Sequence, residues 1–352
     1  MKKGRNSIFG LLGPAFAYKC MLSPLVKIHL FRTFTCPRLR SGLSSFALRT
    51  PQLSPLALFH RKCLKGFLKL SKTAPTPAIH FLLGELPMEG KIHRDMFALF
   101  FGVWSNPDTK IYQIVKYILS NSPENSTTWA INFRHICRMY NLEDPLSYLT
   151  RDPLSKSQFK ENVITRITAF HEKDLRSLAI GNSKMGYLNV SLSGLRGKHH
   201  PCLSNIITAD EVRKLRPHLK FLSGDYLTYQ VKFDQTKKGT PLCKICRQEN
   251  ETICHIISIC PAYDATRTRI LNEIAAVCVS SRSQLNLQSI LENPDILTQF
   301  ILDPTSFNLQ NRVHISDPIV QNLFKLSRDL CFSIHNTRMK SLQTLKEQGT
   351  DK

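Results

Sequence analysis

The sequence predicts a mainly α-helical protein, and three observations predict this fold class. Apolar residues recur at spacings of three and four along most of the chain, which is the period of a helix with one buried face. Residues with a hydroxyl or carboxylate side chain stand directly before proline, a pair typical of helix starts because the side chain caps the first turn and proline lacks an N–H that would have no partner there. Pairs that we interpret as helix starts are Ser23-Pro24, Ser54-Pro55, Thr76-Pro77 and Asp317-Pro318. The third observation is a hydrophobic content of 42% in 352 residues, enough to bury the cores of about two or three helical subdomains.

The segment after Ser54 predicts an amphipathic helix with one basic face. Its buried side is a stripe of apolar residues, Leu56, Phe59, Cys63 and Phe67. The basic face carries Arg61, Lys65 and Lys69 four residues apart, with Lys62 beside them. A solvated surface is one interpretation of such a row, but like charges at this spacing repel and no acidic residue is interleaved. We therefore assign these four residues, named here the basic row, to contact with nucleic-acid phosphates.

Further helices are expected where the same periodicity continues, at about 92–103, 111–119, 129–140, 152–179, 262–279, 285–301 and from Pro318 onward. Thr208 with Glu211 forms a capping box that opens another helix, which Pro217 should kink or interrupt. Between the helices expected up to residue 179 and the helix that starts after Thr208, a stretch containing Gly and Ser predicts a loop and a domain boundary. The expected organisation is a basic helical region at 1–105, a helical connection at 106–180, a loop at 181–207, a module with flanking helices at 208–279 and terminal helices at 280–352.

The charge of the chain favours a polyanionic partner. The sequence has 48 Lys and Arg against 26 Asp and Glu, a formal net charge of +22. Residues 1–84 contain fourteen of these cations and no acidic residue, since Glu85 is the first, so this segment has no acidic partner of its own. Nucleic acid is the first candidate partner, and an anionic membrane surface is the second.

The first residues allow an alternative interpretation. The start Met1-Lys2-Lys3 before an apolar stretch resembles a secretory signal, and an acid-free leader containing Arg and Ser resembles a mitochondrial transit peptide. The alternative function is then an organelle-targeted helical structural or interaction protein with a cleaved leader. No run of residues approaches a membrane span. Eleven scattered cysteines favour a reducing compartment, so a nuclear or cytoplasmic protein is expected, with a mitochondrial one as the alternative.

One cluster of cysteine and histidine has the spacing of a metal site. Cys243 and Cys246 form a C-x2-C pair, and His255 and Cys260 follow at distances suited to a short helix. Such a pair supplies two thiolates from one turn, and three thiolates with one imidazole close a tetrahedral shell around Zn²⁺ with no open position. The cofactor expected is therefore a structural Zn²⁺. Cys254 remains an alternative to His255 as the fourth ligand.

Other chemistry is not indicated by the sequence. His199, His200 and Cys202 are packed too locally to close around one ion, and we interpret them as part of a loop. The chain contains no adjacent pair of aspartates of the kind that holds two magnesium ions in a templated polymerase. Signatures of phosphate-binding loops, serine hydrolases and zinc proteases are missing as well. We therefore expect a binding protein and not an enzyme.

The order of several motifs resembles the part of LINE-type (non-LTR) retrotransposon reverse transcriptases that follows the polymerase palm. The segments concerned are 34–43 (FTCPRLRSGL), in which Arg40 and Ser41 depart from the usual Leu-Tyr, 59–64 (FHRKCL) and 78–87 (AIHFLLGELP). Near the other end, Glu251-Thr252, His255, Cys260-Pro261 and Arg267 behind Cys243 and Cys246 resemble the zinc-binding pattern of that family.

The resemblance implies a thumb-like helical region at 1–105 that grips the template and primer backbone, and a zinc-bound module associated with RNA binding. It adds Arg267 to the residues expected to contact nucleic acid. The partners implied are RNA, DNA or both. The polymerase palm is missing, so the resemblance implies a truncated or decayed copy without polymerase activity of its own.

Overall fold

The computed structural model describes residues 21–46, 48, 50–190, 194–280, 287–307 and 317–348. Within these ranges every regular element is a helix, and the one extended pairing is an isolated antiparallel bridge between Leu242 and Asn250. The prediction of a mainly α-helical fold is confirmed. Among the described helices, none combines the length and the apolar character that crossing a bilayer requires. Residues 1–20, on which the cleaved-leader interpretation depends, lie outside the described residues.

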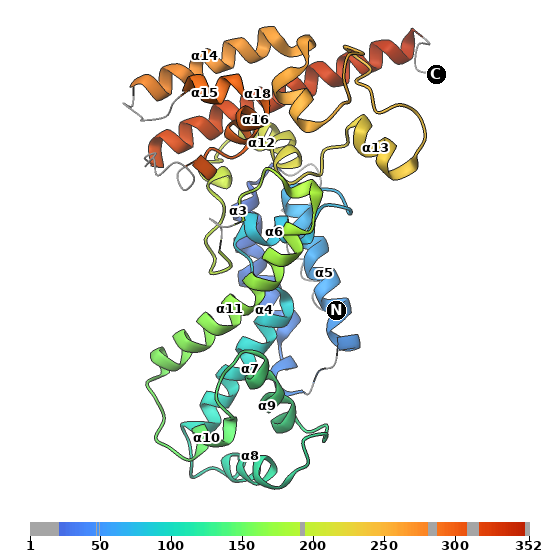
Figure 1. Ribbon diagram of the computed structural model, residues 1–352. Coiled ribbons are helices and arrows are strands. Elements are labelled where there is room, and N and C mark those ends of the chain that lie inside the picture. Colours follow the sequence, from blue (N-terminus) through green and yellow to red (C-terminus); the bar gives the residue numbers. More distant parts are fainter. Residues whose placement is uncertain are drawn as a thin grey trace.

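The first half of the chain forms the lower and middle parts of an elongated molecule (Figure 1). Its elements are α3 (Pro24–Leu30), the π-helical turn η2 (Phe31–Thr35), α4 (Cys36–Arg40), the 3-10 turn η3 (Leu43–Ser45), α5 (Thr50–Leu68), α6 (Thr76–Leu83), α7 (Met88–Trp104), α8 (Lys110–Asn121), α9 (Trp129–Met139), α10 (Pro145–Leu149) and α11 (Lys156–Ile180). The long helix α11 packs against α6 and α7, while α8, α9 and α10 cover the far end of α7.

The second half forms the other end of the molecule around one long helix (Figure 1). Its elements are η4 (Ser183–Met185), η5 (Pro201–Leu203), α12 (Ala209–Leu222), α13 (Tyr229–Thr236), η6 (His255–Ile259), η7 (Pro261–Tyr263), α14 (Asp264–Ser280), α15 (Leu287–Glu292), α16 (Pro294–Leu302) and α18 (Asp317–Glu347). Helices α12 and α14 pack along α18, which buries Phe324 and Ile334 completely. Residues 237–263, which contain the four predicted metal ligands, join α13 to α14 and are called the metal loop.

Several helix ends follow from local capping. Ser23 accepts a hydrogen bond from the Val26 N–H at the start of α3, and the predicted capping box of Thr208 and Glu211 opens α12. The predicted start at Ser54 is wrong, because α5 begins at Thr50, four residues earlier, where Thr50-Pro51 is an equivalent hydroxyl-proline pair. Pro217 does not interrupt α12, which continues to Leu222.

The expected single helix at 285–301 is two helices, and the side chain of Asn293 explains the break. Its carboxamide oxygen accepts hydrogen bonds from the N–H groups of Asp295 and Ile296, and Pro294 is the first residue of α16. An Asn-Pro pair is a strong helix start, so it also ends the preceding helix α15 at Glu292.

The buried face of α5 is rotated relative to the predicted stripe. Leu56 and Phe67 are buried as expected, but Phe59 and Cys63 are only partly buried. The central position is taken by His60, which is fully buried and stacks on Phe31 with ring centroids 5.7 Å apart. An imidazole in an otherwise apolar helix face was not anticipated, because His is more often near the surface.

In the segment expected to be a loop, residues 181–190 and 194–207 are described, and they are irregular backbone with the turns η4 and η5. This backbone contacts both halves of the molecule. The Gly197 N–H donates to the Gly84 carbonyl at 3.0 Å, and the His200 N–H donates to the Leu82 carbonyl at 2.9 Å. Gly84 has φ +60°, and a Cβ there would lie 2.2 Å from the Lys198 carbonyl oxygen. Only glycine therefore fits this crossing point.

Within that segment, His200 is part of a buried ion pair. Its Nε2 lies 3.4 Å from the Asp303 carboxylate, and both side chains are fully buried. His199, His200 and Cys202 do not belong to either group of potential metal ligands among the described residues. The two helical halves are thus joined by polar contacts inside the core.

Acidic residues from later in the sequence neutralise part of the acid-free segment. Arg32 pairs with Glu85 at 2.6 Å, and Arg40 pairs with Asp95 at 2.6 Å. Glu85, the first acidic residue of the chain, is itself 2% exposed and also meets Lys91. The expectation that these cations lack internal partners is therefore wrong for Arg32 and Arg40.

Candidate functional site

The predicted metal ligands converge in the loop between α13 and α14. One potential ligand atom each from Cys243, Cys246, His255 and Cys260 lies within 4.8 Å of the other three. Three of the four residues are buried, and Cys246 is partly buried. Residues up to 17 positions apart in sequence therefore form one compact donor set, which could hold a metal ion.

Backbone hydrogen bonds fix the turn that carries the first two cysteines. The Cys243 N–H donates to the Glu249 carbonyl at 2.8 Å, and the Arg247 N–H donates back to the Cys243 carbonyl at 2.8 Å. Arg247 has φ +59°, the left-handed conformation that reverses the chain directly after the second cysteine. The bridge between Leu242 and Asn250 closes the base of this turn.

The second pair of ligands comes from a short helical turn. His255 begins η6, and its N–H is capped by the Thr252 hydroxyl at 3.0 Å. The Cys260 N–H donates to the His255 carbonyl at 2.7 Å, so one turn sets the spacing between the two side chains. This is the short helix that the spacing predicts.

The geometry fits a tetrahedral ion. Thiolate ligands about 2.3 Å from a tetrahedral Zn²⁺ lie about 3.8 Å from one another. The Cys246 sulfur lies 3.3 Å from His255 Nε2, and the four donor atoms lie within 4.8 Å of one another, so small shifts would bring all four to bonding distance of one ion. The donor set of three sulfurs and one nitrogen is also one that structural zinc sites use.

The imidazole is oriented for this role by a carboxylate. His255 Nδ1 lies 3.2 Å from the Glu249 carboxylate, so Nδ1 carries the proton and Nε2 faces the sulfurs. A carboxylate behind the ligand histidine is the usual partner in metal sites. The alternative ligand Cys254 interacts instead with Thr298 and Asp295 of α16 and does not belong to the donor set, so His255 is the fourth member.

Protons are shared inside the donor set. Hydrogen bonding from Cys260 lowers the pKa of the Cys243 thiol well below its usual value, and the same contact raises the pKa of Cys260. Hydrogen bonding to Cys243, with a smaller contribution from Glu249, raises the pKa of His255 to about 9. These groups hold protons in the positions that a cation would take, so loading the site should release protons.

Arg267 braces the metal loop and is not placed to bind nucleic acid. Its guanidinium donates to the Ile257 carbonyl at 3.0 Å and to the Cys260 carbonyl at 2.7 Å, and it pairs with Asp264 at 2.5 Å. The side chain is 7% exposed, so little of it is left to contact a phosphate. These contacts give Arg267 a supporting role in the metal loop, and they do not support the predicted contact with nucleic acid.

Comparisons with known proteins identify no relative. No family model matches the chain, no curated protein matches it, and no solved structure matches it.

A basic groove adjoins the metal loop and was not predicted. It has a volume of about 1000 Å³ and lies between α13 and α18. Its basic residues are Lys220, Lys232, Lys244, Arg338, Lys340 and Lys346, and Asp225 is its one acidic residue among those described. Lys244 stands between the two cysteines of the C-x2-C pair, and this is the local signal that could have found the groove.

An aromatic ring organises part of this groove. Lys232 and Lys244 lie over the ring of Tyr229, with their Nζ atoms 5.3 and 5.2 Å from its centroid. Arg338 lies 5.7 Å from the same ring. The attraction between a cation and an aromatic face holds these like charges close together.

The basic row lies close to the same groove, because Lys65 contacts the backbone next to Ser71, which lines the groove. The Ser71 N–H and hydroxyl both donate to Asp225, and both residues line the groove. Lys65 Nζ donates to the Lys72 carbonyl at 2.7 Å, beside this contact. Lys62 is exposed on α5, whereas Lys69 lies beyond its last residue with φ +57° and is not on the helix as predicted.

Proposed function

We propose that the chain is a nucleic-acid-binding fragment of a LINE-type retrotransposon reverse transcriptase, with a structural Zn²⁺ site and no polymerase activity of its own. The observation that carries this proposal is the position of Lys244. It lies between two of the four potential metal ligands and lines a groove with five other basic residues.

The metal and the groove are linked through the loop geometry. Cys243 and Cys246 flank Lys244, so holding both sulfurs on one ion fixes the backbone from which Lys244 projects toward Tyr229. In this proposal Zn²⁺ has no catalytic part, because four protein ligands leave it no open position. Its contribution is to hold together the two separate turns of the loop, one with Cys243 and Cys246 and the other with His255 and Cys260.

The groove suits a nucleic-acid backbone. Glu251 neutralises Arg338, and the five other cations against the one carboxylate of Asp225 give the groove a strong positive potential. Its length along α18 runs from Arg338 to Lys346. Lysine side chains make contacts with phosphates that do not depend on base sequence. Lys65 and Lys62 of the basic row extend the positive surface beyond Asp225, so a strand leaving the groove would continue along α5.

The motif order supports the family part of the proposal. The segments that resemble the family form α4, α5, and α6 with the turn to α7, in the order expected for a thumb-like region. The zinc-binding pattern falls on the four converging residues. The proposal therefore combines a sequence resemblance, which includes the donor set, with a basic surface that is independent of it.

The test is fluorescence anisotropy of labelled RNA and DNA with the zinc-loaded full chain, at several salt concentrations. Affinity should fall steeply with salt, and Lys244→Gln with Lys340→Gln should weaken binding to all sequences equally. Each variant should reduce the magnitude of the salt slope by about one. Removing the metal with a chelator should weaken binding as well.

The matched control is Lys160→Gln, which removes an exposed cation on α11 outside the groove. It should leave both affinity and salt slope unchanged. Binding that does not depend on salt, or equal losses in the control and the groove variants, would exclude the groove as the site.

A further inference from the structure

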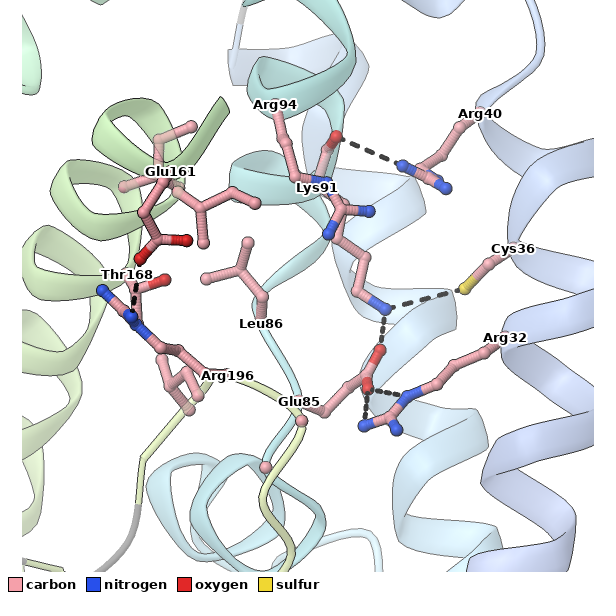
Figure 2. Close-up of a pocket in the computed structure, with 15 residues that line it drawn as sticks. Arg32, Cys36, Arg40, Glu85, Leu86, Lys91, Arg94, Glu161, Thr168 and Arg196 are labelled. Atoms are coloured by element: carbon pink, nitrogen blue, oxygen red, sulfur yellow. Dashed lines mark hydrogen bonds and ion pairs between the residues drawn. The ribbon is translucent and has the colours of Figure 1, made fainter. Parts of the chain in front are cut away.

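A second pocket lies where the acid-free segment meets α7 and α11, and its residues are distant in sequence from the metal loop. It has a volume of about 440 Å³, within the range of small-ligand sites. Figure 2 shows Arg32, Cys36 and Arg40 on one wall, Glu161 and Thr168 of α11 on the other, and Glu85 and Leu86 between them. Residues 195–197, which follow α11, complete the rim.

The pocket is lined by more positive than negative charge. Its cations are Arg32, Arg40, Lys91, Arg94 and Arg196. Its carboxylates are Glu85 and Glu161, and Asp95 pairs with Arg40 from just outside. Five cations against three carboxylates leave two positive charges without a matching carboxylate among the described residues.

The charges in the pocket are not equally satisfied. Arg32 and Lys91 share the single carboxylate of Glu85, and Arg196 pairs with Glu161 at 3.0 Å. No described carboxylate lies within ion-pair distance of the Arg94 guanidinium, and Arg40 Nε is buried without an acceptor among the described residues. The Lys91 side chain is only 8% exposed, so one of the shared cations is held away from solvent.

A metal ion is not the natural occupant of this region. Cys36, His60 and Glu85 bring three potential ligand atoms within 4.8 Å of one another. However, Lys91 Nζ lies 3.8 Å from the Cys36 sulfur and contacts the Glu85 carboxylate, as Figure 2 shows. An ammonium group already occupies the position between these donors, and Arg32 adds a second positive charge there.

We propose that this pocket binds a phosphate monoester as its dianion. Two unmatched cations balance the two negative charges of such a group. The Arg94 guanidinium and the Nε of Arg40 supply hydrogen-bond donors that have no acceptor among the described residues. The volume leaves room for the group that carries the phosphate. A small phosphorylated molecule and the phosphorylated end of an oligonucleotide present the same chemistry. The site is separate from the metal loop and the basic groove, so it does not rest on the function proposed above.

The experiment is isothermal titration calorimetry of the full chain with methyl phosphate at pH 7.5, with dimethyl phosphate as the singly charged comparison. Methyl phosphate should bind saturably and more tightly than dimethyl phosphate. Arg94→Gln should weaken it at least about tenfold, because it removes a charge-assisted hydrogen bond without breaking an ion pair. Arg196→Gln at the rim is a second variant, whose replaced side chain is 46% exposed and therefore tolerant of substitution.

The matched control is Arg166→Gln, an exposed position on α11 that does not line the pocket. It should bind methyl phosphate like the unsubstituted chain. The proposal is overturned by any of three results: no saturable methyl phosphate binding, equal affinity for dimethyl phosphate, or full affinity in both pocket variants.

Competition then distinguishes the two sources of phosphate. A nucleoside monophosphate and a short RNA with either a 5′-phosphate or a 5′-hydroxyl are tested against methyl phosphate, in the Lys244→Gln chain whose groove is weakened. Displacement by the 5′-phosphorylated RNA but not by the 5′-hydroxyl RNA assigns the site to nucleic-acid ends. Displacement by the monophosphate alone assigns it to a small molecule.

Discussion

The guanidinium of Arg338 donates two hydrogen bonds to the carboxylate of Glu251, at 3.0 and 2.8 Å, and both side chains are buried. The two residues are 87 positions apart. The Tyr229 N–H donates a third bond to the same carboxylate at 2.8 Å. Glu251 thus joins three elements: the metal loop, the start of α13 and the middle of α18.

Removing one partner of this pair should destabilise the fold strongly. Glu251→Gln leaves Arg338 buried without a counter-charge, and Arg338→Met leaves Glu251 in the same state. Each should lower the free energy of unfolding by about 3–5 kcal/mol, and the double variant should lose less than the sum. Urea unfolding of the four zinc-loaded proteins measures this. Glu273→Gln, in an exposed pair with Arg269, should cost less than about 1 kcal/mol. Additive losses would show that the two residues act independently.

Metal content should depend on the four converging residues and not on their neighbour Cys254. Elemental analysis of purified protein should give one zinc per chain. Cys243→Ser and Cys260→Ser should lose the metal, because a hydroxyl is a poor substitute for a thiolate. Cys254→Ser should keep it, since this thiol faces α16. Zinc retained in Cys243→Ser, or lost in Cys254→Ser, would contradict the assignment of ligands.

Glu249 should tune metal affinity without being a ligand. Glu249→Gln weakens the acceptor that orients the His255 ring, so zinc affinity should fall by about 10–100-fold, as is usual for such outer partners. Competition with a chromophoric chelator gives the affinity. The backbone carbonyl of Glu249, which accepts from the Cys243 N–H, is unchanged by this substitution. The Glu273→Gln protein provides the baseline, and an equal affinity in the two would remove Glu249 from the site.

The pair of His200 and Asp303 should make stability depend on pH. Burial opposes a charged imidazole, but Cys202 and Asp303 together outweigh it and raise the pKa of His200. A raised pKa contributes stability that is complete below the unfolded value of about 6.5 and declines as pH rises through the folded value. The difference in unfolding free energy between the unsubstituted chain and Asp303→Asn should therefore shrink from pH 6 to pH 9. A constant difference would show that His200 stays neutral.

Local patterns predicted much of this molecule. The capping box of Thr208 and Glu211 and the converging set of Cys243, Cys246, His255 and Cys260 depend on residues close in sequence, so spacing alone was enough to predict both. The helix class followed from apolar periodicity for the same reason. These local patterns did not predict which residues from distant segments of the chain would join each site.

Contacts between distant residues account for the rest. Nothing near Glu251 in the sequence indicates Arg338, and nothing near Arg32 indicates that Glu85 would be buried against it. Arg267 is predicted to contact nucleic acid, because the sequence around an arginine does not show whether its side chain binds a phosphate or donates to backbone carbonyls inside the protein. Lys69 is predicted to lie on the helix, but α5 ends at Leu68 and Lys69 adopts a left-handed backbone. Glycine is the usual residue in that conformation after a helix, so a lysine there does not indicate the helix end.

The pair of Arg338 and Glu251 can form only late in synthesis, because its two residues are 87 positions apart. Synthesis delivers the metal loop well before the segment of α18 that carries Arg338, so a nascent chain can gather its sulfurs around an ion while the Glu251 carboxylate still faces water. A premature stop between codons 261 and 338 would release a product that keeps all four donor residues and lacks Arg338, the partner of Glu251. Such truncated products should retain zinc yet be cleaved readily by proteases around the loop.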